Sequence, residues 1–141
     1  MRLSTTFRKL NRDWNAEPNA PEPSVRVDGR DLILSFEPNG FVFPHYEKVK
    51  LIELTFTDCA RYRLGPTNDE GWYRGQCRFS KLAPKWGEFY EVEGDLRLSK
   101  VPDEWTELPA EPTSRHRHYL FYFRDDTFEC DATGWTKRDI S

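Results

Sequence analysis

The sequence has few cysteines, no long apolar run and no excess of positive charge, and each of these absences excludes a class of protein. Cys59, Cys77 and Cys130 are odd in number and form no CxxC pair, which argues against a disulfide framework or a zinc ribbon. No apolar run approaches the roughly 20 residues that a membrane-spanning helix needs. The N-terminus also lacks the apolar stretch of a signal peptide. We therefore expect a cytoplasmic protein that does not contact a membrane.

The charge balance argues against nucleic acid as a partner. The 21 basic residues are outnumbered by 24 acidic ones, so the chain lacks the long-range positive field that attracts phosphate backbones. Aromatic residues are abundant, with 10 Phe, 6 Tyr and 5 Trp among 141 residues. Because each aromatic side chain buries much surface, we expect an aromatic-rich core in a single domain spanning 1–141.

The start of the chain carries apolar side chains at helical spacing. These side chains are four, three and four residues apart, so they would all lie on one face of a helix. They belong to Leu3, Phe7, Leu10 and Trp14. The stretch NAEPNAPEPS that follows contains three prolines, which predicts an extended connector. We expect a short helix over 1–16, a Pro-rich connector over 17–24 and an antiparallel β domain over 25–135.

From Ser24 onward the apolar pattern changes to a period of two residues, which is typical of strands. The run SVRVDGRDLILSF predicts a hairpin about Asp28-Gly29, a dipeptide that type I′ turns favour because both central residues need a positive φ. Another turn signal, EPNG, precedes the apolar residues FVF. The sequence therefore predicts a mainly β fold, either an antiparallel β-sandwich or a strongly curved sheet, with a short N-terminal helix.

Two later runs show the alternation most clearly. Along KVKLIELTFTDC, the apolar side chains of Ile52, Leu54 and Phe56 share one face, and the polar side chains between them take the other. The segment SRHRHYLFYFRDDTFECDATGW predicts a final hairpin in which 119–123 pairs with 127–132 about a turn at 124–126. The candidates for its inward face are Leu120, Tyr122, Phe128 and Cys130.

His116 and His118 are the sequence's best candidates for a metal site. Residues two apart on a strand lie on one face, where two imidazoles can share an ion. Possible third ligands are His45, Asp125, Asp126 and Glu129. However, His116 follows a Pro-rich loop, so only His118 is expected inside the strand, and the neighbouring arginines oppose cation binding. We therefore expect a solvated strand entry and no metal.

Catalytic arrangements find little support. Acids beside Cys59 and Cys130 disfavour the thiolate, and Cys77 lies on the predicted inward side of its strand. Acid pairs fall in predicted turns, where they serve solubility and backbone hydrogen bonding; they are Asp69-Glu70, Asp103-Glu104 and Asp125-Asp126. The sequence thus predicts no catalytic residue, no cofactor and no enzyme activity.

The charge layout favours a protein partner. Between Trp86 and Glu111 there are eight acids and two bases. An acidic surface that carries aromatic anchors suits capture of a basic protein, because complementary charge speeds the encounter and the aromatic side chains hold the complex. The predicted partner-binding residues are Glu88, Tyr90, Glu91, Glu93, Asp95, Glu104 and Trp105.

An alternative hypothesis uses the aromatic residues alone. Exposed rings on a β domain can stack against a sugar or another small flat ligand. Such a platform would be built from Trp72, Trp86, Trp105 and Tyr90. The competing interpretation is that these rings fold back to close the core.

Within residues 13–39, the segments DWNAEPNAPEP and LILSFEPN resemble the start of small uncharacterised bacterial proteins. Immunity proteins, which neutralise toxins used between competing bacteria, are among such proteins. The resemblance implies a non-enzymatic protein whose partner is a basic toxin, and it assigns no catalytic residue. Together with the charge layout, it leads us to predict an immunity-type binding protein.

Overall fold

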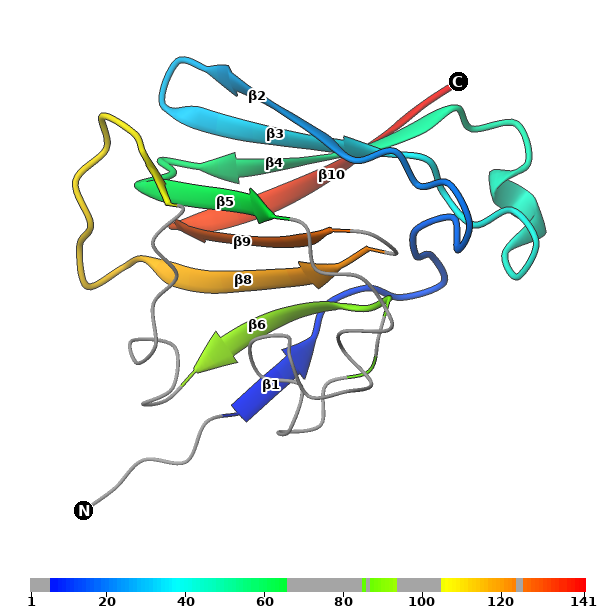
Figure 1. The fold of residues 1–141 in the computed structure, drawn as a ribbon, viewed down its shortest axis with the longest axis horizontal. Helices are drawn as coiled ribbons and strands as arrows, with labels where there is room; N and C mark the ends of the chain where they lie inside the picture. Colours follow the sequence, from blue (N-terminus) through cyan, green and yellow to red (C-terminus); the bar gives the residue numbers. More distant parts are fainter. Residues whose placement is uncertain (1–5, 66–84, 86, 94–104, 124–125) are drawn as a thin grey trace.

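The computed structural model describes residues 6–65, 85, 87–93, 105–123 and 126–141, and these form two antiparallel sheets (Figure 1). In spatial order, the first sheet holds β1 (Thr6–Lys9), β6 (Phe89–Glu93), β8 (Arg117–Tyr122), β9 (Thr127–Ala132), β5 (Arg61–Gly65) and β7 (Thr106–Glu107). The second holds β10 (Gly134–Ile140), β4 (Leu51–Thr57), β3 (Asp31–Phe36) and β2 (Ser24–Asp28). A short 3₁₀ turn, η1, covers Pro44–Tyr46. The prediction of a mainly β, antiparallel fold is confirmed.

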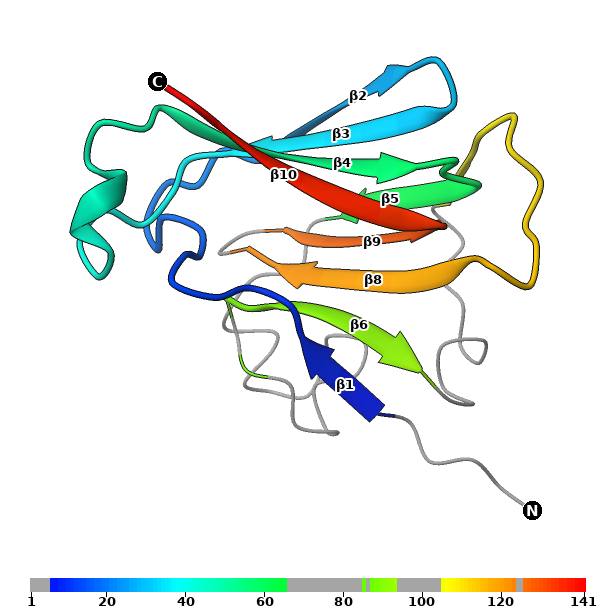
Figure 2. The same ribbon diagram turned by 180° about the vertical axis from the view of Figure 1, so that it is seen from behind.

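An aromatic core joins the two sheets. Phe36 of β3 lies 5.1 Å, centroid to centroid, from Phe121 of β8, and Phe56 of β4 lies 5.4 Å from Phe128 of β9. The chain passes from one sheet to the other at three places, between β1 and β2, between β4 and β5 and between β9 and β10. Figure 2 shows β10 starting where β9 ends and lying along β4. The alternation of Ile52, Leu54 and Phe56 is confirmed, because all three lie in this core.

The predicted N-terminal helix is wrong. Residues Thr6–Lys9 form β1, which pairs with β6 at the edge of the first sheet, and Phe7 lies opposite Val92. The backbone of Asp13 has a φ of 57°, which no right-handed helix accommodates. The apolar residues at helical spacing find apolar contacts without forming a helix. Phe7 contacts Tyr90, and Trp14 enters the core from a loop. Leu3 lies outside the described residues.

The predicted β2–β3 hairpin is confirmed, but its turn differs from the expected type. Asp28 pairs with Asp31, so the two central residues are Gly29 and Arg30. Only Gly29 has a positive φ, 62°, which fits a type II′ turn with glycine at its first central position rather than a type I′ turn. Glycine is needed here because this backbone conformation strains residues that carry a Cβ.

The final hairpin also forms as predicted. Two of the four side chains expected to face the core, Leu120 and Tyr122, instead face the other side of the sheet. The register pairs Tyr119 with Cys130 and Phe121 with Phe128, and cross-strand partners share a face. Phe128 and Cys130 therefore lie in the core together with Tyr119 and Phe121. Leu120 and Tyr122 are buried on the opposite side of the first sheet. We call that side the outer face.

Candidate functional site

The residues predicted to bind a partner do not form one exposed surface. Tyr90 is buried, and its hydroxyl accepts a hydrogen bond of 2.7 Å from the backbone N–H of Lys85. Burial raises the pKa of Tyr90. Glu91 is only 3% exposed and accepts hydrogen bonds from Arg8 at 3.0 Å and Arg117 at 3.2 Å. Both side chains stabilise the first sheet and are unavailable to a partner.

The other predicted residues are divided between local contacts and the surface. Glu88 accepts a hydrogen bond from Asn11, and Lys9 Nζ lies 3.5 Å from its carboxylate. Glu93 is exposed at the end of β6. The guanidinium carbon of Arg61 lies 4.3 Å from the centroid of the Trp105 ring, so one face of that indole is covered. Asp95 and Glu104 lie outside the described residues, as do Trp72 and Trp86, so within the described part of the chain no stacking platform forms at Tyr90 and Trp105.

Five charged side chains alternate in sign across β5, β9 and β8 on the outer face. Arg63 Nη1 donates to Glu129 at 3.0 Å, and Arg61 Nε donates to Asp131 at 2.6 Å. Between the two carboxylates lies His118, whose Nε2 is 2.7 Å from Glu129 and whose Nδ1 is 2.8 Å from Asp131. We call these five residues the charge ladder.

The charge ladder holds His118 as an imidazolium. Burial lowers the pKa of His118, but its hydrogen bonds to Asp131 and Glu129 and their negative charges outweigh burial, so the pKa is raised above its ordinary value. Asp131 responds in the opposite sense. Burial raises the pKa of Asp131, but the bonds and positive charges of His118 and Arg61 prevail and lower it to about 2.

The charge ladder is built for structure rather than for proton transfer. A general base needs a free nitrogen or oxygen within reach of a substrate. His118 is 1% exposed and Glu129 fully buried, and both ring nitrogens of His118 are already bonded to carboxylates. Trp105 covers the ladder further, with its ring 6.0 Å from that of His118. The prediction that His118 lies in a solvated strand entry is therefore wrong, because Glu129 and Asp131 of β9 bond to the ring on a buried face of the sheet.

His116 and His118 do not converge on a common point. His116 precedes β8, as predicted; its Nδ1 accepts the backbone N–H of Thr113 at 3.0 Å and its Nε2 donates to the carbonyl of Asp58 at 2.7 Å. Glu129, one of the possible third ligands, bonds His118 directly. Among the residues that the structure describes, no group of three or more His, Cys, Asp or Glu is placed to hold a metal ion.

The two described cysteines lie in the core as free thiols. Cys59 and Cys130 are both buried, as predicted. Burial, the nearby Cys59 and the neighbouring acids raise the pKa of Cys130 well above its ordinary value, which opposes the thiolate that nucleophilic chemistry needs. Cys77 lies outside the described residues, together with the acid pairs Asp69-Glu70 and Asp103-Glu104 and with Asp125.

A turn after β3 exposes two adjacent apolar side chains. Phe41 is 80% exposed and Val42 63%, although large apolar side chains are elsewhere mostly in the core. The turn is held from beneath by Asn39, whose side-chain oxygen accepts the backbone N–H groups of Phe41 at 3.1 Å and Val42 at 3.2 Å. The backbone N–H of Asn39 in turn donates to the carbonyl of Asn15 at 3.0 Å. The two side chains are thus presented to solvent by a turn whose backbone is fixed.

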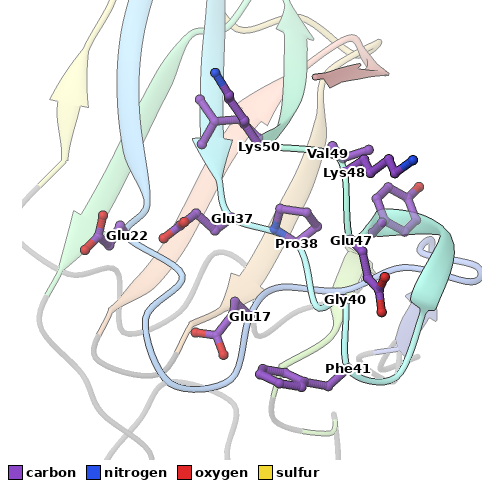
Figure 3. A pocket seen from close by; sticks show the side chains of 12 residues that line it. Glu17, Glu22, Glu37, Pro38, Gly40, Phe41, Glu47, Lys48, Val49 and Lys50 are labelled. Atoms are coloured by element: carbon purple, nitrogen blue, oxygen red, sulfur yellow. The ribbon is translucent and has the colours of Figure 1, made fainter.

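Phe41 stands at the rim of a groove with a volume of about 860 Å³ (Figure 3). We call it the Phe41 groove; it lies between the loop after Ala16, the end of β3 and the segment leading into β4. Four of its lining residues are glutamates and two are lysines: Glu17, Glu22, Glu37, Glu47, Lys48 and Lys50. None of these six forms an ion pair within the described residues. The groove therefore combines exposed apolar surface with unneutralised carboxylates.

Comparison with known proteins adds no candidate, since no family model, no curated protein and no solved structure matches the chain. None of the described residues belongs to a helix with the length and apolar character that crossing a bilayer requires.

The Phe41 groove was not predicted from the sequence, although a local signal was present. Phe41 and Val42 lie between Asn39-Gly40 and Pro44, so the apolar run is too short for a strand and is bounded on both sides by residues typical of turns. An apolar tripeptide so confined has little chance to enter a sheet. The acids of the groove gave no such signal, because they come from loops that are separate in the sequence.

Proposed function

We propose that this chain is a non-enzymatic protein-binding protein whose partner docks on Phe41 and Val42. The observation that carries the proposal is the exposure of these two side chains on a turn fixed by Asn39. An exposed aromatic side chain on an ordered backbone loses little conformational entropy on binding, which makes it an effective anchor. The adjoining groove supplies the concave surface into which a partner can fit.

The resemblance of residues 13–39 suggests the finer proposal that the partner is a bacterial toxin. A loop-built surface on a rigid β scaffold suits an inhibitor that covers a partner's active site, because the scaffold keeps the loops in place. The acidic residues of the Phe41 groove agree with a basic partner. This proposal places the partner on the loops around Phe41 and not on the acidic surface predicted at 86–111, because Tyr90 and Glu91 are buried.

Site-specific photo-crosslinking in the source cells tests the binding proposal. A photoreactive side chain at Val42 should link one defined protein, whereas the same group at Thr106, an exposed position on β7, should not. The captured protein, produced recombinantly, should bind the wild-type chain at least tenfold more tightly than Phe41→Ser. Equal binding of both forms, or adducts that do not depend on position 42, would contradict the proposal.

The immunity proposal needs a second readout. Expression of the captured protein alone should arrest growth, and co-expression of this chain should restore it, whereas the Phe41→Ser chain should fail to do so at equal protein level. A captured protein that is harmless to cells would remove the toxin from the proposal while leaving partner binding intact.

A further inference from the structure

The Phe41 groove carries an imbalance of charge that selects among possible partners. Its four glutamates and two lysines give it a local charge of −2, and Figure 3 shows Glu17, Glu22 and Glu37 at one end with the amines of Lys48 and Lys50 directed elsewhere. Three acids on the sheets differ in this respect, because Glu53, Glu91 and Glu129 each face an arginine within 3.2 Å. The groove brings several carboxylates without an ion pair together beside exposed apolar surface.

The backbone holds these carboxylates in place. The N–H of Glu17 donates to the carbonyl of Glu37 at 2.8 Å, and the N–H of Glu37 donates to the carbonyl of Pro21 at 2.8 Å. One oxygen of Glu17 also accepts the backbone N–H groups of Asn19 and Ala20, which orients its carboxylate. The three acids therefore come from two loop segments that are bonded to each other.

The exposed ring of Phe41 completes a site for a cation with a flat apolar face. In Figure 3 the ring lies on the Glu17 side of the groove. A guanidinium group can stack on an aromatic ring and donate two parallel hydrogen bonds to a carboxylate, whereas an ammonium group can do only part of this. Phe41 together with Glu17 thus matches arginine better than lysine.

We propose that the Phe41 groove receives an arginine side chain from an exposed segment of the partner, stacked on Phe41 and paired with Glu17, while Glu22 and Glu37 add negative charge farther along the groove. This inference rests on the proposed function and adds the chemistry that the partner must present. Charge complementarity favours this occupant over an acidic segment, because four glutamates would repel it. A purely apolar segment is also disfavoured, because it would leave the carboxylates desolvated and unpaired.

Selection from a random peptide library tests the occupant directly. Phage-displayed 12-residue peptides are selected on the full-length wild-type chain and counter-selected on Phe41→Ser. The selected peptides should carry arginine next to an apolar residue. In calorimetry, a synthetic copy of the best peptide should lose at least tenfold in affinity when its arginine is replaced by citrulline, which keeps the shape and removes the charge, and a smaller factor when it is replaced by lysine.

The matching change on the protein is Glu17→Gln, which should weaken the arginine peptide at least tenfold and leave the citrulline peptide unaffected. Glu107→Gln, at an exposed acid on β7, is the control and should change neither affinity. Circular dichroism verifies that each variant is folded.

The remaining outcomes separate this inference from the proposed function. Peptides that need Phe41 but bind equally well with citrulline would overturn the arginine site and leave the protein-binding proposal standing. Selection that yields no Phe41-dependent peptide would overturn both. Arginine peptides whose affinity is unchanged by Glu17→Gln would place the cation elsewhere and so also overturn this inference.

Discussion

The charge ladder and the Phe41 groove use the same kinds of side chain in opposite ways. In the ladder, Glu129 and Asp131 alternate with arginine and histidine on a buried sheet face, and every one of the five charges has a partner within 3.0 Å. In the groove, glutamates from loops face solvent without an ion pair in the described structure. A stabilising cluster therefore differs from a surface that can recognise a ligand in whether its acids are paired with basic side chains, and not in how many acids it has.

The difference follows from where the backbone places each group. On neighbouring strands, cross-strand register brings His118 opposite Asp131 and Arg63 opposite Glu129, so the sheet itself creates the pairs. A charge buried in this way must be paired, since an isolated buried ion is very costly. Loops impose no such register, and their acids can stay hydrated at little cost. Matched changes in the two regions should therefore have very different effects.

Among changes of charge, the largest effect is expected from Glu129→Gln, which removes one charge from the ladder. The change leaves His118 and Arg63 buried with too little negative charge between them, and we expect the free energy of unfolding to fall by about 3 kcal/mol. Urea denaturation followed by tryptophan fluorescence measures this loss. The matched control is Glu22→Gln in the groove, which should change stability by less than about 0.5 kcal/mol. Similar losses in both variants would show that the ladder and the groove do not differ as described.

The second prediction uses acid to break the ladder at Asp131. Because its pKa falls from the ordinary 3.8 to about 2 in the folded chain, ionised Asp131 contributes stability above pH 3.8 that is lost as the pH falls through about 2. This shift corresponds to about 2 kcal/mol. The stability difference between the wild type and Asp131→Asn should shrink by that amount between pH 5 and pH 2. A difference that stays constant over this range would show that Asp131 is not held by His118 and Arg61.

The third prediction concerns the other end of the pH scale. His118 has a raised pKa, so its contribution is fully present below the unfolded value of 6.5 and is lost as the pH rises through the folded value. One proton limits this loss to about 1.4 kcal/mol per pH unit. Nitrogen-detected NMR should find both ring nitrogens predominantly protonated at pH 6.5, and stability relative to His118→Gln should decline as the ring titrates at higher pH. A ring that is neutral at pH 6.5 would contradict the imidazolium assignment.

The sequence predicts those parts of the fold that depend on neighbouring residues in the chain. The alternation of Ile52, Leu54 and Phe56 identifies β4, because a period of two is a local property of strands. The edge strand β1 could not be recognised in this way: four residues are too few to show a period, and Phe7 and Leu10 also fit a helix. Its pairing partner β6 lies more than 80 residues away, with Phe7 opposite Val92.

The candidate sites could be predicted less well, because they depend on register and on the meeting of loops. His118 could be identified as a strand residue, but its burial depends on Glu129 and Asp131 facing it from β9. Tyr90 and Glu91 belong to an acidic stretch of sequence, yet they are buried on opposite faces of one strand, each with a partner from another part of the chain. Sequence counts of charge cannot show such pairing.

The smallest effect on stability is expected at the groove's apolar rim. Phe41→Ser removes an aromatic ring that is 80% exposed, so unfolding free energy should change by less than about 0.5 kcal/mol. The same change at Phe128, whose ring is fully buried between the sheets, should cost about 3 to 5 kcal/mol. Parallel urea titrations compare the two. If Phe41→Ser lost more than about 1 kcal/mol, the ring would be packing within the folded chain, and the anchor on which the proposed docking depends would be lost.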